Sequence, residues 1–162
     1  MDINNINISL EYKIRFTNQN KNNPSIFLLH GYGSNMNDLF SLHQFFPEDW
    51  TIVSLQAPFG TGFGGWAWAE LDFNNLRELP KPEQRLSSRN KIISSISTII
   101  NELHLDQSKV HLIGFSQGAS FTLFCGVTYP KMFHGLGALC GYFDYKKVKD
   151  DVSPKNIKNL NI

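Results

Sequence analysis

The apolar residues of this chain gather in two kinds of segment. Continuous apolar runs are typical of strands covered on both faces, and they occur at residues 25–29 (SIFLL), 51–55 (TIVSL), 110–115 and 135–140. Residues 8–16 (ISLEYKIRF) instead alternate between apolar and polar side chains, which predicts an antiparallel strand at the edge of a sheet. We therefore expect one sheet whose inner strands are buried.

Helical spacing appears between those runs. Pro82 opens a segment in which isoleucines recur at three- and four-residue steps as far as about His104, which predicts a long helix with one face on the sheet. Residues 117–128 predict a second helix, and Asn37 could cap a shorter one. Strands that alternate with helices predict an α/β domain, with a doubly wound, mostly parallel sheet and helices on both faces.

Residues 56–80 have no clear period and contain several glycines. A loop of this length inside a compact domain is expected to be either functional or disordered. It also carries a cluster of aromatic residues, namely Phe59, Phe63, Trp66, Trp68 and Phe73.

Composition indicates a single domain. The 162 residues are 41% hydrophobic, which is enough for one compact core over residues 1–162. The net charge of +1, without a basic cluster, argues against a nucleic-acid partner. The N-terminus lacks the pattern of a signal peptide, and no run approaches the roughly 20 apolar residues of a membrane span. We therefore expect a cytoplasmic protein without stable membrane insertion.

The two cysteines, Cys125 and Cys140, lie among apolar residues. Neither has a His or Cys at metal-ligand spacing, so no metal site is predicted. Cysteine is among the most buried residue types, and nothing else in the sequence indicates the oxidising compartment that a disulfide needs. We predict two buried free thiols.

Ser116 stands in Gly114-Phe115-Ser116-Gln117-Gly118, which fits Gly-x-Ser-x-Gly between a predicted strand and a predicted helix. In that arrangement a sharp turn lifts the serine hydroxyl above the sheet, and small residues on either side leave room for neighbouring backbone. The new helix also directs partial positive charge at the site. The alternatives are an ordinary strand-to-helix turn and a phosphate-binding loop, and the latter needs a Gly-Lys-Ser/Thr sequence that is absent. We interpret Ser116 as a catalytic nucleophile.

A second glycine turn, His30-Gly31-Tyr32-Gly33, follows an earlier buried strand. Acyl transfer needs two backbone N–H donors aimed at the developing oxyanion, one from the residue after the nucleophile and one from such an earlier loop. We therefore assign Gln117 and Tyr32 to the oxyanion hole. A glycine turn after a strand is common, so this motif indicates an oxyanion hole only in combination with the serine motif.

Three segments together resemble the phospholipase/carboxylesterase family of small α/β-hydrolases, which includes acyl-protein thioesterases and bacterial carboxylesterases. They are LLHGYGSN (28–35), GGWAW (64–68) and LIGFSQGA (112–119). The resemblance implies an α/β-hydrolase fold and an esterase or thioesterase without metal or organic cofactor. It also implies that an apolar acyl group passes the loop aromatics Phe63, Trp66 and Trp68. Ala69 departs from the family, where another aromatic is usual.

The acid and base of the triad are expected elsewhere. In this fold the order along the chain is Ser, then Asp or Glu, then His, and the resemblance places the last two beyond residue 162. The histidines at positions 43, 104, 111 and 134 are expected out of reach of Ser116, and His30 is expected to be structural. Asp144 stays open as a displaced acid. We therefore expect an incomplete domain that lacks its last strands and helix and is inactive alone.

The sequence thus predicts a serine carboxylic-ester hydrolase that acts on small apolar acyl esters, or on thioesters, through an acyl-enzyme at Ser116. The alternative is a non-catalytic remnant that binds an acyl group or a partner. An incomplete sheet would leave an apolar edge that another chain could cover, for example in a homodimer.

Overall fold

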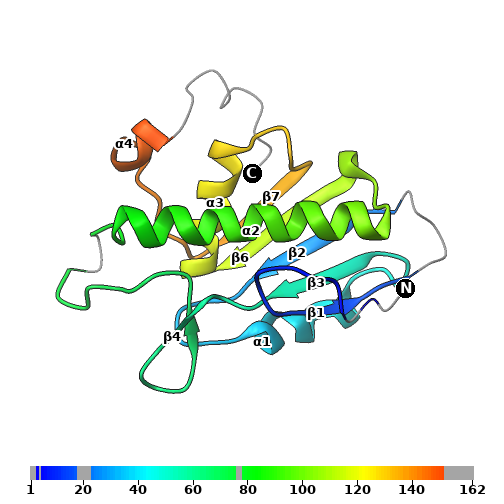
Figure 1. Cartoon of the computed structure of the whole chain (residues 1–162), viewed down its shortest axis with the longest axis horizontal. Helices are drawn as coiled ribbons and strands as arrows, with labels where there is room; N and C mark the ends of the chain where they lie inside the picture. Colours follow the sequence, from blue (N-terminus) through cyan, green and yellow to red (C-terminus); the bar gives the residue numbers. More distant parts are fainter. Residues whose placement is uncertain (1–2, 4, 18–22, 76–77, 152–162) are drawn as a thin grey trace.

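A computed structural model of the chain describes residues 3, 5–17, 23–75 and 78–151. Five strands form one twisted sheet in the order β1–β3–β2–β6–β7 (Figure 1). The edge strand β1 is antiparallel to β3, and the other neighbouring strands are parallel. The strands of this sheet are β1 (Tyr12–Arg15), β2 (Ser25–Leu29), β3 (Thr51–Leu55), β6 (Val110–Phe115) and β7 (Gly135–Leu139).

A separate two-stranded hairpin lies beside the sheet and consists of β4 (Phe59–Gly60) and β5 (Trp66–Ala67). The helices alternate with the strands of the sheet. The α-helices are α1 (Met36–Phe40), α2 (Pro82–Leu103), α3 (Gln117–Thr128) and α4 (Tyr145–Val148). Three 3₁₀ turns, η1 (Ser41–Phe45), η2 (Gln107–Lys109) and η3 (Lys149–Asp151), complete the described elements.

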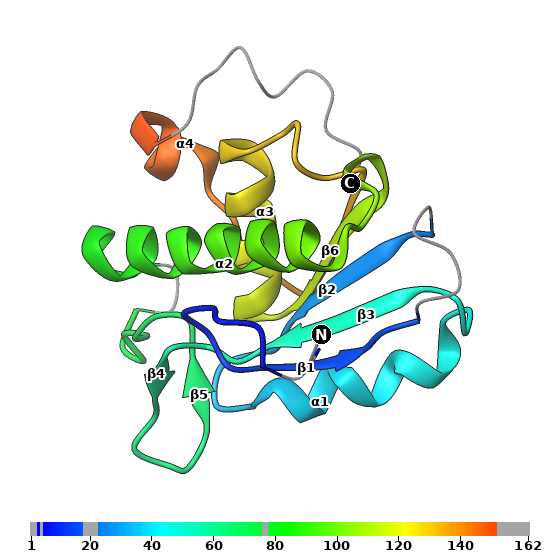
Figure 2. The same ribbon diagram turned by 45° about the vertical axis from the view of Figure 1, so that its right-hand side comes forward.

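The sheet is covered on both faces, as predicted. Alternate residues of β2 point to opposite sides: Phe27 and Leu29 belong to the core under α2 and α3, whereas Ile26 and Leu28 pack in a second cluster beside α1. Figure 2 shows α1 on one side of the sheet and α2 and α3 on the other. Each of these side chains is almost fully buried, which contributes about 1.5–3 kcal/mol per residue to the free energy of unfolding.

Helix α2 follows its predicted bounds closely. Its buried isoleucines recur at three- and four-residue steps and face the sheet. The helix ends at His104, which adopts a left-handed conformation with φ of 52°. The N–H of Leu105 then donates to the carbonyl of Ile100, in the pattern of a Schellman motif. This ending turns the chain back toward β6.

Two local predictions are corrected by the structure. The alternating segment 8–16 forms a shorter strand, because β1 covers only Tyr12–Arg15. Helix α1 is capped by Asn35 rather than Asn37, since the Asn35 side chain accepts a hydrogen bond from the Asn37 N–H at 2.9 Å. Either asparagine fits the sequence pattern, and the turn at residues 31–34 decides which one precedes the helix.

The cysteine prediction holds for one residue. Cys125 is a fully buried free thiol on α3, and burial raises its pKa to about 12. Cys140 is also free, but it is exposed and has a φ of 58°, so its predicted burial is wrong. It directly follows β7, the strand at the sheet's edge.

The sequence of residues 157–162 looks like the approach to one more strand, and that segment lies outside the described residues. No helix among residues 3, 5–17, 23–75 and 78–151 is long and apolar enough to cross a membrane.

Candidate active site

The register of the parallel strands brings three loops to one edge of the sheet. Leu29 of β2 lies opposite Gly114 of β6, and Phe115 of β6 lies opposite Leu139 of β7. The residues that follow these strands therefore meet at the carboxyl ends, where open α/β sheets bind their ligands. Ser116 occupies the middle of this edge.

Ser116 joins β6 to α3 with a φ of 52° and a ψ of −115°. A residue other than glycine is uncommon at positive φ, because its backbone is strained there. Such strain persists only where the surrounding structure imposes it. Here the Ser116 N–H donates to the Leu139 carbonyl at 2.8 Å, and the Ser116 carbonyl accepts from the Ser120 N–H at 3.2 Å. These contacts hold the sharp turn that the sequence motif predicts.

The two glycines of that motif are required by close backbone contacts. A Cβ atom at Gly114 would lie 2.3 Å from the Gly118 carbonyl oxygen, and one at Gly118 would lie 2.1 Å from the Leu29 carbonyl oxygen. Both distances are far below van der Waals contact. The spacing Gly-x-Ser-x-Gly thus reflects how tightly α3 enters against β2 and β6.

The His30–Gly33 turn lies directly beside the serine. A Cβ atom at Gly31 would be 3.5 Å from the Ser116 Cβ. The turn is closed by the Ser34 N–H, which donates to the Gly31 carbonyl at 3.3 Å, and it is tied to β5 by the Gly33 N–H, which donates to the Trp66 carbonyl at 2.9 Å. The structure thus brings the two predicted oxyanion segments together.

The backbone N–H groups of Tyr32 and Gln117 are available at this place. Within the described part of the chain, neither donates a hydrogen bond to another protein group. Gln117 is the first residue of α3, so its N–H has no acceptor inside the helix. These are the two donors that the sequence assigns to an oxyanion, and that role stays a prediction.

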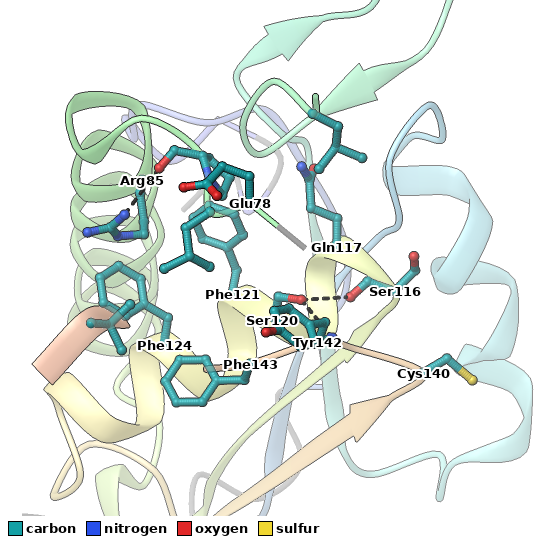
Figure 3. A pocket seen from close by; sticks show the side chains of 14 residues that line it. Glu78, Arg85, Ser116, Gln117, Ser120, Phe121, Phe124, Cys140, Tyr142 and Phe143 are labelled. Atoms are coloured by element: carbon teal, nitrogen blue, oxygen red, sulfur yellow. Dashed lines mark hydrogen bonds between the residues drawn. The ribbon is translucent and has the colours of Figure 1, made fainter. Parts of the chain in front are cut away.

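A cavity of about 240 Å³ opens beside Ser116. Figure 3 shows Ser116 and Gln117 at one end of the lining, with Phe121, Phe124 and Phe143 farther along it. The lining is mostly apolar, and its residues are Leu71, Glu78, Leu79, Pro80, Arg85, Ser116, Gln117, Ser120, Phe121, Phe124, Cys140, Tyr142, Phe143 and Val148.

Each charged residue of this lining has a nearby partner of opposite charge. Arg85 forms an ion pair with Asp151 at 2.7 Å, and its guanidinium lies over the Phe124 ring. Glu78 lies 3.8 Å from the Lys147 ammonium. The cavity therefore offers an apolar interior to a ligand, with its charges paired at one end.

The three loop aromatics with a predicted substrate contact do not line this cavity. Trp68 is fully buried, and its indole N–H donates to the His30 carbonyl at 2.8 Å. The centroids of its ring and the Phe121 ring are 6.2 Å apart. Phe63 is 92% exposed in the turn of the β4–β5 hairpin, and Trp66 is partly exposed in β5. Their contact with substrate stays a prediction.

The aromatic wall comes instead from residues that the sequence reasoning did not single out. Phe121 and Phe124 project from α3 one turn apart, and Phe143 follows β7. The signal for the first two was present, because apolar residues three apart on the helix that follows Ser116 share one face. No comparable signal marked Phe143.

A family model described as phospholipase/carboxylesterase matches residues 14–158. The chain belongs to the phospholipase/carboxylesterase family. The resemblance that the three sequence motifs carry is therefore confirmed. A search of curated proteins gave no significant match.

Solved structures of esterases are similar to the chain. Esterase PE8 is 26% identical, with a TM-score of 0.73 over 90% of this chain and 70% of its own. Carboxylesterases from Mesorhizobium loti and Bacillus cereus are 16% and 17% identical, each with a TM-score of 0.69 over 80% of this chain. The chain covers 60% and 59% of those two proteins. The predicted α/β-hydrolase fold is confirmed.

This member of the family places no histidine against Ser116 within its described residues, which include all five histidines of the sequence. His111 and His134 lie at the opposite edge of the sheet, with ring centroids 5.2 Å apart. His43 is in η1 and His104 ends α2. The remaining one, His30, is fully buried beside the oxyanion turn.

Asp144, the acid left open by the sequence, caps α4 and accepts a hydrogen bond from the Lys146 N–H at 3.0 Å. It does not line the cavity at Ser116. Among the residues that the structure describes, no three His, Cys, Asp or Glu side chains gather in a group that could hold a metal ion.

Proposed function

We propose that Ser116 is the nucleophile of a carboxylic-ester hydrolase that works through an acyl-enzyme. The observation that carries this proposal is the strained position of Ser116 at the end of an apolar cavity, beside the Gly31–Tyr32 turn. A hydroxyl held above the sheet at the start of a helix is the arrangement that acyl-transfer enzymes of this fold use. Membership of the phospholipase/carboxylesterase family supports the same chemistry.

The proposed reaction has two steps. The Ser116 oxygen attacks the ester carbonyl, a base takes its proton, and the negative charge on the carbonyl oxygen is stabilised by the Tyr32 and Gln117 N–H groups. The alcohol then leaves with a proton, and water releases the acid from the acyl-enzyme in a second step. Each oxyanion donor contributes about 10²–10³ in kcat in enzymes of this type.

The cavity favours an apolar acyl group as the part of the substrate next to Ser116. Phe121, Phe124 and Phe143 provide the wall, while Glu78 and Arg85 have partners of opposite charge. An apolar chain loses no hydrogen bond on entering such a space, whereas a charged acyl group would leave water without compensation. Thioesters present the same carbonyl and are included in the proposal.

A general base is the component that the described residues do not supply to Ser116. A serine hydroxyl reacts slowly until a base removes its proton. We therefore expect the 162-residue chain to hydrolyse p-nitrophenyl butyrate at close to the background rate. If this chain hydrolysed the ester as fast as ordinary esterases do, one of its five histidines would have to reach Ser116.

The nucleophile is tested in the natural protein, called full-length below, together with any residues that flank these 162. We expect a fluorophosphonate probe to label a single serine, which peptide mass spectrometry identifies as Ser116, and we expect Ser116→Ala to abolish both labelling and ester hydrolysis. Ser94→Ala is the matched control, because Ser94 is an exposed residue of α2 whose hydroxyl donates to the Lys91 carbonyl within the same helix, and it does not line the cavity at Ser116. An unlabelled and inert full-length protein would contradict the proposal.

A second candidate is an acyl-binding protein without turnover, favoured by the lack of any histidine contact to Ser116 among the described residues. It predicts that the full-length protein binds decanoate in calorimetry but neither hydrolyses esters nor reacts with the fluorophosphonate. Labelling at Ser116 would reject it.

A further inference from the structure

His30 is fully buried, and both of its ring nitrogens make hydrogen bonds. Its Nε2 lies 3.1 Å from the backbone N of Ala57 and 3.2 Å from the Nε2 of Gln56. Its Nδ1 lies 2.8 Å from the carbonyl oxygen of Gly31, the next residue. This ring therefore connects the end of β3 to the turn beside Ser116.

These partners determine where the proton of the ring is. A backbone N–H can only donate, so the Nε2 of His30 must accept the hydrogen bond from Ala57 and carry no proton. The Gln56 side chain supports the same assignment. Its Oε1 accepts from the Met36 N–H at 3.1 Å, so its NH₂ group is turned to His30 as a second donor. The proton is consequently on Nδ1, which donates to the Gly31 carbonyl.

The Gly31 carbonyl belongs to the same peptide unit as the Tyr32 N–H. In a trans peptide the carbonyl and the N–H point in opposite directions, so fixing one fixes the other. The carbonyl is held by the His30 ring at 2.8 Å and by the Ser34 N–H at 3.3 Å. The Tyr32 N–H must therefore point away from His30.

We propose that His30 is a positioning residue: its Nδ1–H holds the Gly31–Tyr32 peptide in the one orientation that presents the Tyr32 N–H to the oxyanion at Ser116. The inference rests on the proposed esterase function. A rotated peptide would turn the Gly31 carbonyl toward the oxyanion and replace attraction by repulsion. His30 thus acts on the reaction through the backbone and does not exchange protons with the substrate.

The tautomer is tested first, in the 162-residue chain itself and without any activity. A long-range ¹H–¹⁵N correlation spectrum of the histidines distinguishes a proton on Nδ1 from one on Nε2. We expect neutral His30 with its proton on Nδ1 at pH 7. A proton on Nε2, or a doubly protonated ring, would overturn the proposal.

Two variants of similar size then separate positioning from folding in the full-length protein. The amide of His30→Asn can reach the position of Nδ1 and donate to Gly31, whereas the amide of His30→Gln reaches the position of Nε2 and can only serve Ala57. His30→Gln loses the single contact at Nδ1, whereas His30→Asn loses both contacts at Nε2, with Gln56 and Ala57. A purely structural role therefore predicts that His30→Asn loses at least as much stability and activity as His30→Gln.

Positioning predicts the opposite order for kcat. We expect His30→Gln to lower kcat by about 10²-fold with KM little changed, because the oxyanion exists only after attack. His30→Asn should retain most of the kcat, although it gives up two hydrogen bonds and its melting temperature should be no higher than that of His30→Gln. Equal kcat values for the two variants, or a higher kcat for His30→Gln, would overturn the positioning role.

The outcome for His30 is distinguishable from that for the esterase. Failure of Ser116→Ala to abolish hydrolysis would remove the proposed function and with it the positioning role of His30, whatever the tautomer. Loss of activity in Ser116→Ala together with equal kcat values for His30→Asn and His30→Gln would leave the esterase standing and overturn only the inference about His30.

Discussion

The side chain of Gln117 pairs with the backbone on both sides of the Trp68–Ala69 peptide. Its Oε1 accepts from the Trp68 N–H at 2.8 Å, and its Nε2 donates to the Ala69 carbonyl at 2.7 Å. Gln117 is only 7% exposed, so these groups have little access to water. The residue after the nucleophile therefore fixes the aromatic loop to the start of α3.

Gln117→Ala is expected to lower the free energy of unfolding by about 2–4 kcal/mol, because it leaves two buried backbone groups without partners. Urea denaturation measures the change. Gln84→Ala is the matched control, since Gln84 accepts from the Glu70 N–H of the same loop at an exposed position, and its loss should be below about 1 kcal/mol. Equal losses in the two variants would contradict the buried pairing.

Gly118→Ala is expected to be strongly destabilising. The new methyl carbon would lie 2.1 Å from the Leu29 carbonyl oxygen, and backbone on both sides cannot yield as a flexible side chain would. We expect a loss of about 3 kcal/mol or more in thermal or urea unfolding. Gly60→Ala, where nothing lies within 4 Å of the added carbon, should fold with nearly unchanged stability. A stable Gly118→Ala protein would show that α3 enters less tightly.

Stability is expected to fall as the pH falls below about 6.5. Burial lowers the pKa of His30 below its ordinary value of 6.5, although Gly31 and Asp38 act in the opposite direction. Burial, together with the charge of His134, likewise lowers the pKa of His111. The unfolded chain therefore binds protons at a higher pH than the folded chain does, and the difference favours unfolding from pH 6.5 downward.

Urea unfolding at pH 7.5 and pH 5.0 measures this effect. Wild-type protein should be less stable at the lower pH, and His111→Asn should show a smaller difference between the two values because one of the two groups is gone. An unchanged difference in His111→Asn would assign the effect to His30 alone, and equal wild-type stability at both pH values would contradict both assignments.

The two thiols are expected to react at very different rates. Cys125 has a pKa raised to about 12 by burial and is shielded from solvent, whereas Cys140 is exposed. Iodoacetamide at pH 8 should add one label to the folded protein, at Cys140, and two in denaturant. Cys140→Ser should leave the folded protein unlabelled, and fast labelling of Cys125 would contradict its burial. Mass spectrometry counts the labels.

Local patterns predicted the elements of this fold well where packing and sequence agree. The apolar run at residues 25–29 can bury all its side chains only as an inner strand, and the isoleucines after Pro82 share one face only in a helix. Both elements formed as expected. Ser116 was placed at a strand-to-helix turn for the same reason, because two glycines at fixed distances have a steric cause that needs no knowledge of the rest of the chain.

The sequence could not decide which way a side chain in the long loop would point. Trp68 looks like a residue for an apolar ligand, but its indole N–H, its backbone N–H and its carbonyl all bond to distant residues, namely His30, Gln117 and Ser88. Such partners become neighbours only in the folded chain. The same applies to Phe143, which reaches the cavity only because the chain turns back after β7.

Trp68 also has a dynamic consequence. The Trp68 indole N–H donates to the carbonyl of His30, and its backbone N–H donates to the side chain of Gln117 at the start of α3. The His30–Gly33 turn and the start of this helix, which flank Ser116, are therefore tied to each other. Their relative geometry is set when the chain folds, before any ligand enters the cavity.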